Sequence, residues 1–143
     1  MDTVRNILEI KGNMVYTVCP DSSVYEALEI LQEKNLGSLV VLEDDGTLDG
    51  IFTERDYARK VILKGRSSRE TLVRHIMTED PIFVSPDTEI SDCMKLMSEK
   101  FVRHLPVLDS GKLVGLVSIG DLVNYIISQK DIIIEHLEHY ITS

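Results

Sequence analysis

Along the chain, segments whose apolar residues have helical spacing alternate with short apolar segments typical of strands. The same series of segments occurs twice. The first helical face has apolar residues three and four positions apart, namely Val24, Ala27, Leu28 and Leu31. A short, almost continuous apolar run at 38–42 is typical of a buried strand. A turn rich in Asp and Gly joins it to a second apolar run at 48–53, which predicts a β-hairpin.

These spacings predict a β-α-β-β-α unit in the first half of the chain. Ser23 and Glu26 can form a capping box at the start of the first helix, and Gly37 is expected to stop it. The expected elements are a strand at 16–18, a helix from residue 24, strands at 38–42 and 48–53, and a helix at about 54–64.

The second half predicts the same order of elements. They are a strand at 82–84, a helix at 90–100, strands at 104–108 and 113–118, and a last helix that begins near Gly120. The tail from 126 to 141 is helical and apolar on one side, which indicates a packing or dimer surface. Apolar residues near the N-terminus indicate a short docking helix.

The two halves are copies of one pattern. Pro20-Asp21 recurs 66 residues later as Pro86-Asp87, and after a one-residue gap in the hairpin turn the offset of 65 relates Asp56 to Asp121. A turn is where such a gap is tolerated. We therefore predict an α/β (α+β) fold in which two β-α-β-β-α repeats, related by a pseudo-twofold axis, pack into one module.

This duplication also predicts how the chain is divided. The expected parts are an N-terminal helix and linker at 1–11, a first repeat at 12–65, a linker at 66–80, a second repeat at 81–128 and a C-terminal helical extension at 129–143.

Composition narrows the class of protein. The chain has 143 residues, 43% of them hydrophobic, and a net charge of −9, which is typical of a soluble globular domain. It has no apolar run of membrane-spanning length and no signal-peptide pattern at its start. Its acidity disfavours nucleic acid as a partner. The two cysteines fit no ligand spacing, so we expect a cytoplasmic protein without a metal.

Basic residues are concentrated in one segment of this acidic chain. Seven of the 15 Lys and Arg residues lie between positions 55 and 75, where only two acidic residues are found. Such a concentration indicates either a local anion site or a solvated face with ion pairs. The pattern by itself leaves both interpretations open.

The segment with the clearest chemistry occurs once in each repeat. Gly50 to Asp56 and Gly115 to Asp121 each place a hydroxyl, Thr53 or Ser118, at the end of a strand and an aspartate three residues later. A hydroxyl beside the free N–H groups of a helix start can hold a phosphate, and the carboxylate can accept both hydroxyls of a ribose. The same spacing is also that of a helix capping box, and caps duplicate as well.

The repeat resembles a tandem pair of CBS domains, often called a Bateman module. The resemblance rests on the two Pro-Asp turns, the paired strands at 39–42 and 103–108, and both Gly-x-x-Thr/Ser-x-x-Asp segments, and it covers roughly residues 12 to 127. The stretch at 50–60 and the segments at 64–68 and 76–78 are similar to small stand-alone CBS-pair proteins of bacteria and plant organelles.

This resemblance implies a regulatory module, not an enzyme. It implies an adenosine-containing ligand such as AMP, ADP, ATP, NAD(H) or S-adenosylmethionine, and a partner protein that responds to ligand binding. It also implies homodimers in which two modules form a flat disc.

Site residues carried over from the resemblance fall into two sites shared between the repeats. Thr53 and Ser118 become phosphate ligands, and Asp56 and Asp121 become ribose ligands. The first site combines Ser118 and Asp121 with Tyr16, Thr17, Val18 and Val40. The second combines Thr53 and Asp56 with Ile82, Phe83, Val84 and Pro106.

Basic residues distinguish the two sites. Arg103 and His104 resemble residues on the phosphate side of the cleft, and Gly37 and Ser38 stand at their places in the first repeat. Arg55, included among the nucleotide-binding residues, has Gly120 as its counterpart. The two sites are therefore expected to differ in affinity.

Two other functions compete with the nucleotide sensor. One is an interaction and dimerisation module with vestigial sites, whose apolar helices dock a partner. The other, nucleotide hydrolysis, is disfavoured because Asp56 and Asp121 each belong to their own repeat and no nucleophile, base or metal cluster accompanies them. His136 and His139 lie at helical spacing but lack a third ligand in sequence.

Overall fold

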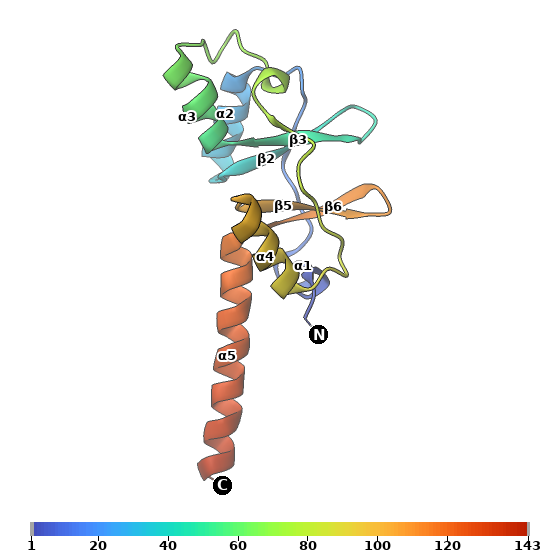
Figure 1. The fold of residues 1–143 in the computed structure, drawn as a ribbon, viewed down its shortest axis with the longest axis vertical. Coiled ribbons are helices and arrows are strands. Elements are labelled where there is room, and N and C mark those ends of the chain that lie inside the picture. Colours follow the sequence, from blue (N-terminus) through green and yellow to red (C-terminus); the bar gives the residue numbers. More distant parts are fainter. Residues whose placement is uncertain (1, 143) are drawn as a thin grey trace.

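The computed structural model describes residues 2–142 as two similar α/β units stacked on each other. The two sheets lie next to each other in the middle of the molecule, with helices beyond each sheet, and the last helix projects away from the second unit (Figure 1). The mixed α/β fold predicted from the duplicated pattern is confirmed. None of the helices among residues 2–142 is long and apolar enough to cross a membrane.

The first repeat is built on a four-stranded sheet in the order β1-β2-β3-β4. Strand β1 runs parallel to β2, whereas β2–β3 and β3–β4 are antiparallel pairs. Strand β4 comes from the linker between the repeats. The elements are β1 (Thr17–Val18), α2 (Val24–Lys34), β2 (Ser38–Leu42), β3 (Leu48–Thr53), α3 (Glu54–Lys60), the 3-10 turns η1 (Ile62–Lys64) and η2 (Val73–His75), and β4 (Thr78–Glu79).

The second repeat has a two-stranded sheet in place of this larger one. Strands β5 and β6 form an antiparallel hairpin, and the helix after β6 runs without a break to the end of the described chain. The elements are α4 (Ile90–Lys100), β5 (His104–Asp109), β6 (Lys112–Ser118) and α5 (Ile119–Thr142).

The predicted strand at 82–84 is wrong, because only Val84 pairs, in a single parallel bridge to Val107. Pro106 explains the difference. Its counterpart in the first repeat, Val40, donates its N–H to the carbonyl of Tyr16 (3.4 Å), and proline has no N–H to donate.

Two predicted helix ends also differ from the structure. Helix α2 ends at Asn35, which adopts the left-handed conformation (φ 55°), two residues before the Gly37 expected to stop it. Asparagine tolerates this conformation better than most residues. The helix expected to reach residue 64 ends at Lys60, and a 3-10 turn closed by Gly65 (φ 67°) follows.

Each repeat has its own hydrophobic core, formed where the apolar helix face meets the sheet. The first core contains Val24, Ala27, Leu31, Leu39, Phe52 and Val73. The second contains Ile90, Cys93, Met97, Leu105, Val117 and Leu122. These residues are the apolar positions at helical and strand-like spacing, together with residues from the connecting segments.

The two repeats are joined by an exchange of the segments that precede them. Helix α1 (Val4–Lys11), the predicted docking helix, leads into the first repeat but packs on the second. The Val4 N–H donates to Thr88 O (2.9 Å), and in the same way Val73 N–H donates to Ser22 O (2.8 Å) on the first repeat. Each repeat is thus completed by the segment that leads into the other, which makes them one module.

Candidate functional site

The first motif, Thr53 to Asp56, closes β3 and opens α3 as a complete capping box. Thr53 Oγ1 accepts the Asp56 N–H at 3.1 Å, and Asp56 Oδ2 accepts the Thr53 N–H at 3.0 Å. The other carboxylate oxygen, Oδ1, lies 3.1 Å from Lys60 Nζ and accepts the Thr78 hydroxyl at 3.3 Å. Asp56 is only 7% exposed, so these partners satisfy a buried charge.

The second motif, Ser118 to Asp121, has the same reciprocal bonds at the junction of β6 and α5. Ser118 N–H donates to Asp121 Oδ2 at 2.8 Å, and Asp121 N–H donates to Ser118 Oγ at 3.1 Å. The lysine at this motif lies on a different helix from its aspartate, whereas Lys60 and Asp56 share α3. Lys11 Nζ, at the end of α1, lies 2.6 Å from Asp121 Oδ2. The same ammonium donates to Leu116 O at 2.8 Å.

Both motifs therefore act as helix caps, which was one of the two interpretations of the sequence. Each also places a hydroxyl, a carboxylate and a lysine at one strand–helix junction. The sequence argument missed the two lysines and Thr78. Lys60 could have been found, since it lies one helical turn after Asp56, but Lys11 and Thr78 reach the motifs only through the fold.

Chain connectivity links each motif to the first strand of the opposite repeat. Lys11 contacts Asp121, and five residues later the chain reaches Tyr16 beside β2 of the first repeat. Thr78 contacts Asp56, and four residues later the chain reaches Ile82, next to the bridge between Val84 and Val107.

Among the residues expected to face adenine, the aromatic ones are accessible and the aliphatic ones are enclosed. Tyr16 is 37% exposed and Phe83 56% exposed. Thr17 is exposed and Ile82 is half-buried. The remaining four, Val18, Val40, Val84 and Pro106, are buried.

The repeats approach each other where β2 and β5 begin. A Cβ atom built on Gly37 would lie 3.8 Å from the His104 imidazole. Burial lowers the pKa of His104, and the nearby Asp121 carboxylate opposes this effect. Arg103 and Arg55 are exposed, the first just before β5 and the second in the first turn of α3. His104 therefore lies between the second motif and the first repeat.

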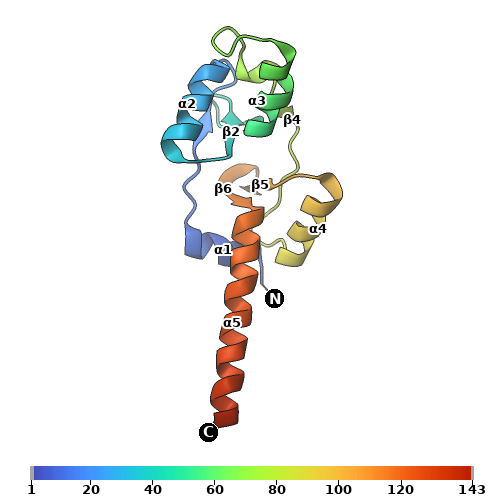
Figure 2. The same cartoon turned by 90° about the vertical axis from the view of Figure 1, so that its left-hand side faces the viewer.

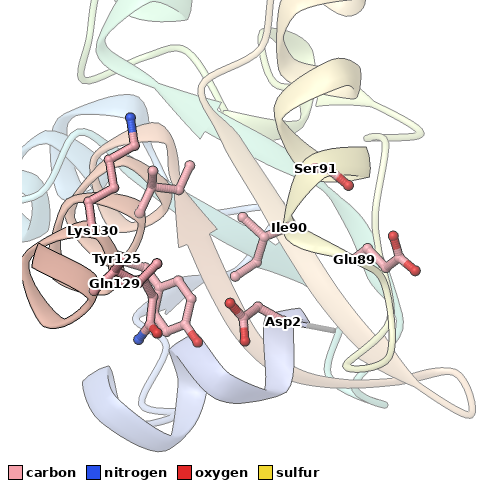
Figure 3. A pocket seen from close by; sticks show the side chains of 9 residues that line it. Asp2, Glu89, Ile90, Ser91, Tyr125, Gln129 and Lys130 are labelled. Carbon is pink, nitrogen blue, oxygen red and sulfur yellow. The ribbon is translucent and has the colours of Figure 1, made fainter. Parts of the chain in front are cut away.

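Two surface cavities lie away from both motifs. One of about 460 Å³ lies between the start of α4 and the middle of α5, and includes Ile90, Tyr125 and Ile133 in its lining (Figure 3). The other, of about 320 Å³, lies beside α1 and is lined in part by Arg5 and Asp109. Neither includes a residue predicted to bind nucleotide.

No group of three or more His, Cys, Asp or Glu residues within 2–142 is arranged to hold a metal ion. His136 and His139 lie exposed on the projecting part of α5.

These features define a tandem-repeat module. It has two stacked α/β repeats, each repeat is packed against by the segment that leads into the other, and each has a capped hydroxyl-x-x-Asp junction. The CBS-domain family model matches residues 4–63 and 73–128. The chain therefore belongs to the CBS-domain family and is a CBS-pair protein.

Known relatives agree with this assignment. The chain is 37% identical over 147 residues to the mitochondrial CBS domain-containing protein CBSX3 of Arabidopsis thaliana, an alignment that covers 97% of this chain and 71% of CBSX3. A putative signal-transduction protein with CBS domains from Burkholderia ambifaria has a similar structure, with a TM-score of 0.85 and 49% identity over 88% of this chain and 94% of that one.

A third relative was solved with a ligand. CBSX2 in complex with AMP has a TM-score of 0.73 and 31% identity to this chain, and the match covers 91% of this chain and 99% of CBSX2.

Proposed function

We propose that this chain is a regulatory module that binds an adenosine-containing ligand, such as AMP, ADP, ATP or NAD(H), between its two repeats. The observation that carries the proposal is the duplicated hydroxyl-x-x-Asp junction. The aspartate of each copy contacts a residue, Lys11 or Thr78, that lies a few positions before the first strand segment of the opposite repeat. The AMP complex of the related CBSX2 supports the same ligand class.

In this proposal the capping groups also bind the ligand. Thr53 and Ser118 bind phosphate, and Asp56 and Asp121 bind the ribose hydroxyls. The ribose hydroxyls then replace some of the hydrogen bonds that the two carboxylates accept without ligand. Tyr16 and Phe83 are accessible enough to pack on an adenine ring. Lys11 and Lys60, already beside the carboxylates, would offset the negative charge of a phosphate.

The two sites are proposed to be unequal. The site around Asp121 takes its lysine from α1 and has His104 nearby, whereas the site around Asp56 takes its lysine from its own helix. A ligand that displaces Lys11 from Asp121 would loosen α1 from the second repeat. Such a change in packing is what a partner protein would detect.

The test is a thermal-shift screen of the purified protein against AMP, ADP, ATP, NAD, NADH and S-adenosylmethionine. A ligand at about 100 times its Kd stabilises the folded state by about 2.7 kcal/mol, which raises Tm by several degrees. The double variant Asp56→Ala/Asp121→Ala should lose the shift, and exposed Asp44→Ala should keep it. An unchanged shift in the folded double variant would refute the site assignment.

An interaction module with vestigial sites is the second candidate. It is favoured by the lysines that already hold both carboxylates and by the exposed apolar residues of α5. It predicts that no nucleotide raises Tm. A phosphate-release assay with ATP separately tests the disfavoured hydrolase. In both cases we propose a cytoplasmic, non-enzymatic homo-oligomer that acts on a partner protein.

A further inference from the structure

The second half of α5 extends beyond the body of the molecule. Figures 1 and 2 show the helix leaving the second repeat and running free to its end, and every side chain described from 130 to 139 is exposed. A helical segment of about 13 residues is marginally stable in water by itself. Burial within the described chain therefore does little to stabilise this part of α5.

One exposed side of α5 carries a regular apolar stripe, which begins in the first half of the helix and which we call the α5 seam. Its positions are separated by steps of four and three residues, which is the heptad spacing of a coiled coil. The seam consists of Val123, Ile127, Lys130, Ile134, Leu137 and Ile141. The five apolar members are between 39% and 79% exposed. It is about 27 Å long, from 1.5 Å of rise per residue.

The kind of residue at each seam position selects a partner geometry. Isoleucine occupies one of the two alternating heptad positions, at 127, 134 and 141, and the other position holds Val123, Lys130 and Leu137. In parallel coiled coils, β-branched residues at the first position favour two strands when leucine stands at the second, as Leu137 does here. The spacing is thus that of a two-stranded coiled coil.

We propose that the α5 seam binds the α5 seam of a second copy of this chain, as a parallel two-stranded coiled coil. This inference rests on the proposed function, which includes a homo-oligomer, and it assigns the surface through which the copies associate. Charge complementarity supports the second copy as the partner. Lys130, the one polar residue in the seam, would face Lys130 of the other copy, and the two adjacent Asp131 carboxylates would offset the two ammonium charges; both side chains are exposed here.

Apolar surface continues from the seam onto the second repeat. Ile126 and Ile133, on the edge of the seam, line the 460 Å³ cavity together with Ile90 and Tyr125 (Figure 3). The paired α5 helices would therefore lie next to this cavity, where α5 meets the second repeat. A change in the position of α5 on pairing would affect α4, because α4 lines the same cavity.

A matched pair of variants tests the surface. Ile134→Glu places a charge in the seam, and Ile132→Glu places the same charge on an isoleucine of similar exposure (43% against 51%) on the opposite side of the helix. Light scattering over a wide range of protein concentration should show half the wild-type mass for Ile134→Glu and the wild-type mass for Ile132→Glu. Lys130→Leu should strengthen the association, since it removes the polar residue from the seam.

The outcomes separate this inference from the wider proposal. An unchanged mass for Ile134→Glu, in a protein that self-associates, overturns the seam but leaves the homo-oligomer. A monomeric wild-type protein overturns both, while nucleotide binding is tested independently by the thermal shift. Orientation is tested with Ile141→Cys in a Cys19→Ser background. A parallel pair brings the two thiols within disulfide distance, and absence of the cross-linked dimer overturns the parallel arrangement.

Discussion

The motifs of the two repeats share their local geometry and differ in what surrounds them. Both form the same reciprocal capping box. The Asp56 side chain is 9% exposed and is held by its own helix and by β4, whereas Asp121 is 23% exposed and is held by the end of α1. The comparison shows that a cap is determined by four consecutive residues, while the environment of its carboxylate depends on which lead segment docks there.

The largest expected difference between the repeats concerns their paired glycines. A Cβ at Gly50 would lie 2.6 Å from the backbone carbonyl of Thr78 and 2.8 Å from Met77 Sδ. The three atoms nearest to a Cβ at Gly115 all belong to the Leu8 side chain, the first of them at 2.7 Å. Gly50→Ala should therefore displace β4 and cost roughly 2–3 kcal/mol, and Gly115→Ala about 1 kcal/mol, because a side chain can rotate away.

Chemical denaturation of the two single variants measures this difference. The matched control is Gly111→Ala in the β5–β6 turn, where a Cβ meets no atom within 4 Å but the backbone has positive φ (82°). It reports the cost of backbone strain without a steric clash. Equal losses for Gly50→Ala and Gly115→Ala would contradict the assigned contacts.

A smaller difference is expected for the two aspartates. Asp56→Ala removes one half of the capping box of α3, since Thr53 Oγ1 still accepts the N–H of residue 56, and it leaves the Thr53 N–H, the Thr78 hydroxyl and Lys60 without their shared partner. Polar groups left unpaired at a buried position cost about 1–2 kcal/mol. Asp121→Ala should cost less, about 1 kcal/mol, because its carboxylate is more exposed, and each lysine keeps a bond to a backbone carbonyl, Lys11 to Leu116 O and Lys60 to Ile76 O.

Thermal unfolding without ligand, at low and high salt, distinguishes the two aspartate variants. High salt should remove most of the difference in Tm between the Asp121→Ala variant and the wild-type protein, because salt screens an accessible ion pair. The reverse order of stability would show that the more exposed carboxylate is the more important one.

The smallest expected effect is a pH dependence confined to the second repeat. Burial lowers the pKa of His104 from its ordinary value of 6.5, so below that pH the unfolded chain binds a proton that the folded chain does not. Folded stability should therefore fall as pH drops below 6.5, until the folded pKa is reached. His104→Ser, which introduces the first-repeat residue Ser38, should reduce the loss of Tm between pH 7.5 and about 5.5. An identical loss in both proteins would exclude a role for His104.

Much of the fold could be predicted from local pattern. The bounds of β2, β3 and α4 agree with their predicted ranges, and the β5–β6 hairpin agrees to within one residue at each end. Helix periodicity and turn residues act over a few positions, so a single chain displays them directly. The domain boundaries and the nucleotide roles of the site residues stay predictions.

The error at 82–84 arises because a distant residue decides the outcome. The strand expected at 82–84 fails because the N–H it needs would come from residue 106, which is proline. The helix end at Asn35 in place of Gly37 has a local cause, because asparagine also tolerates the left-handed conformation. Spacing within a segment cannot reveal whether the facing segment offers a donor.

The sequence by itself determined that there are two copies of one unit, where their caps lie and which face of each helix is apolar, because these properties depend on neighbours within one or two helical turns. Only the tertiary structure decided that α1 packs on the second repeat and the linker on the first, and thereby that Lys11 meets Asp121 and Thr78 meets Asp56. Lys11 and Asp121 are 110 residues apart in the chain. Their contact depends on the packing of whole repeats, and no local pattern encodes it.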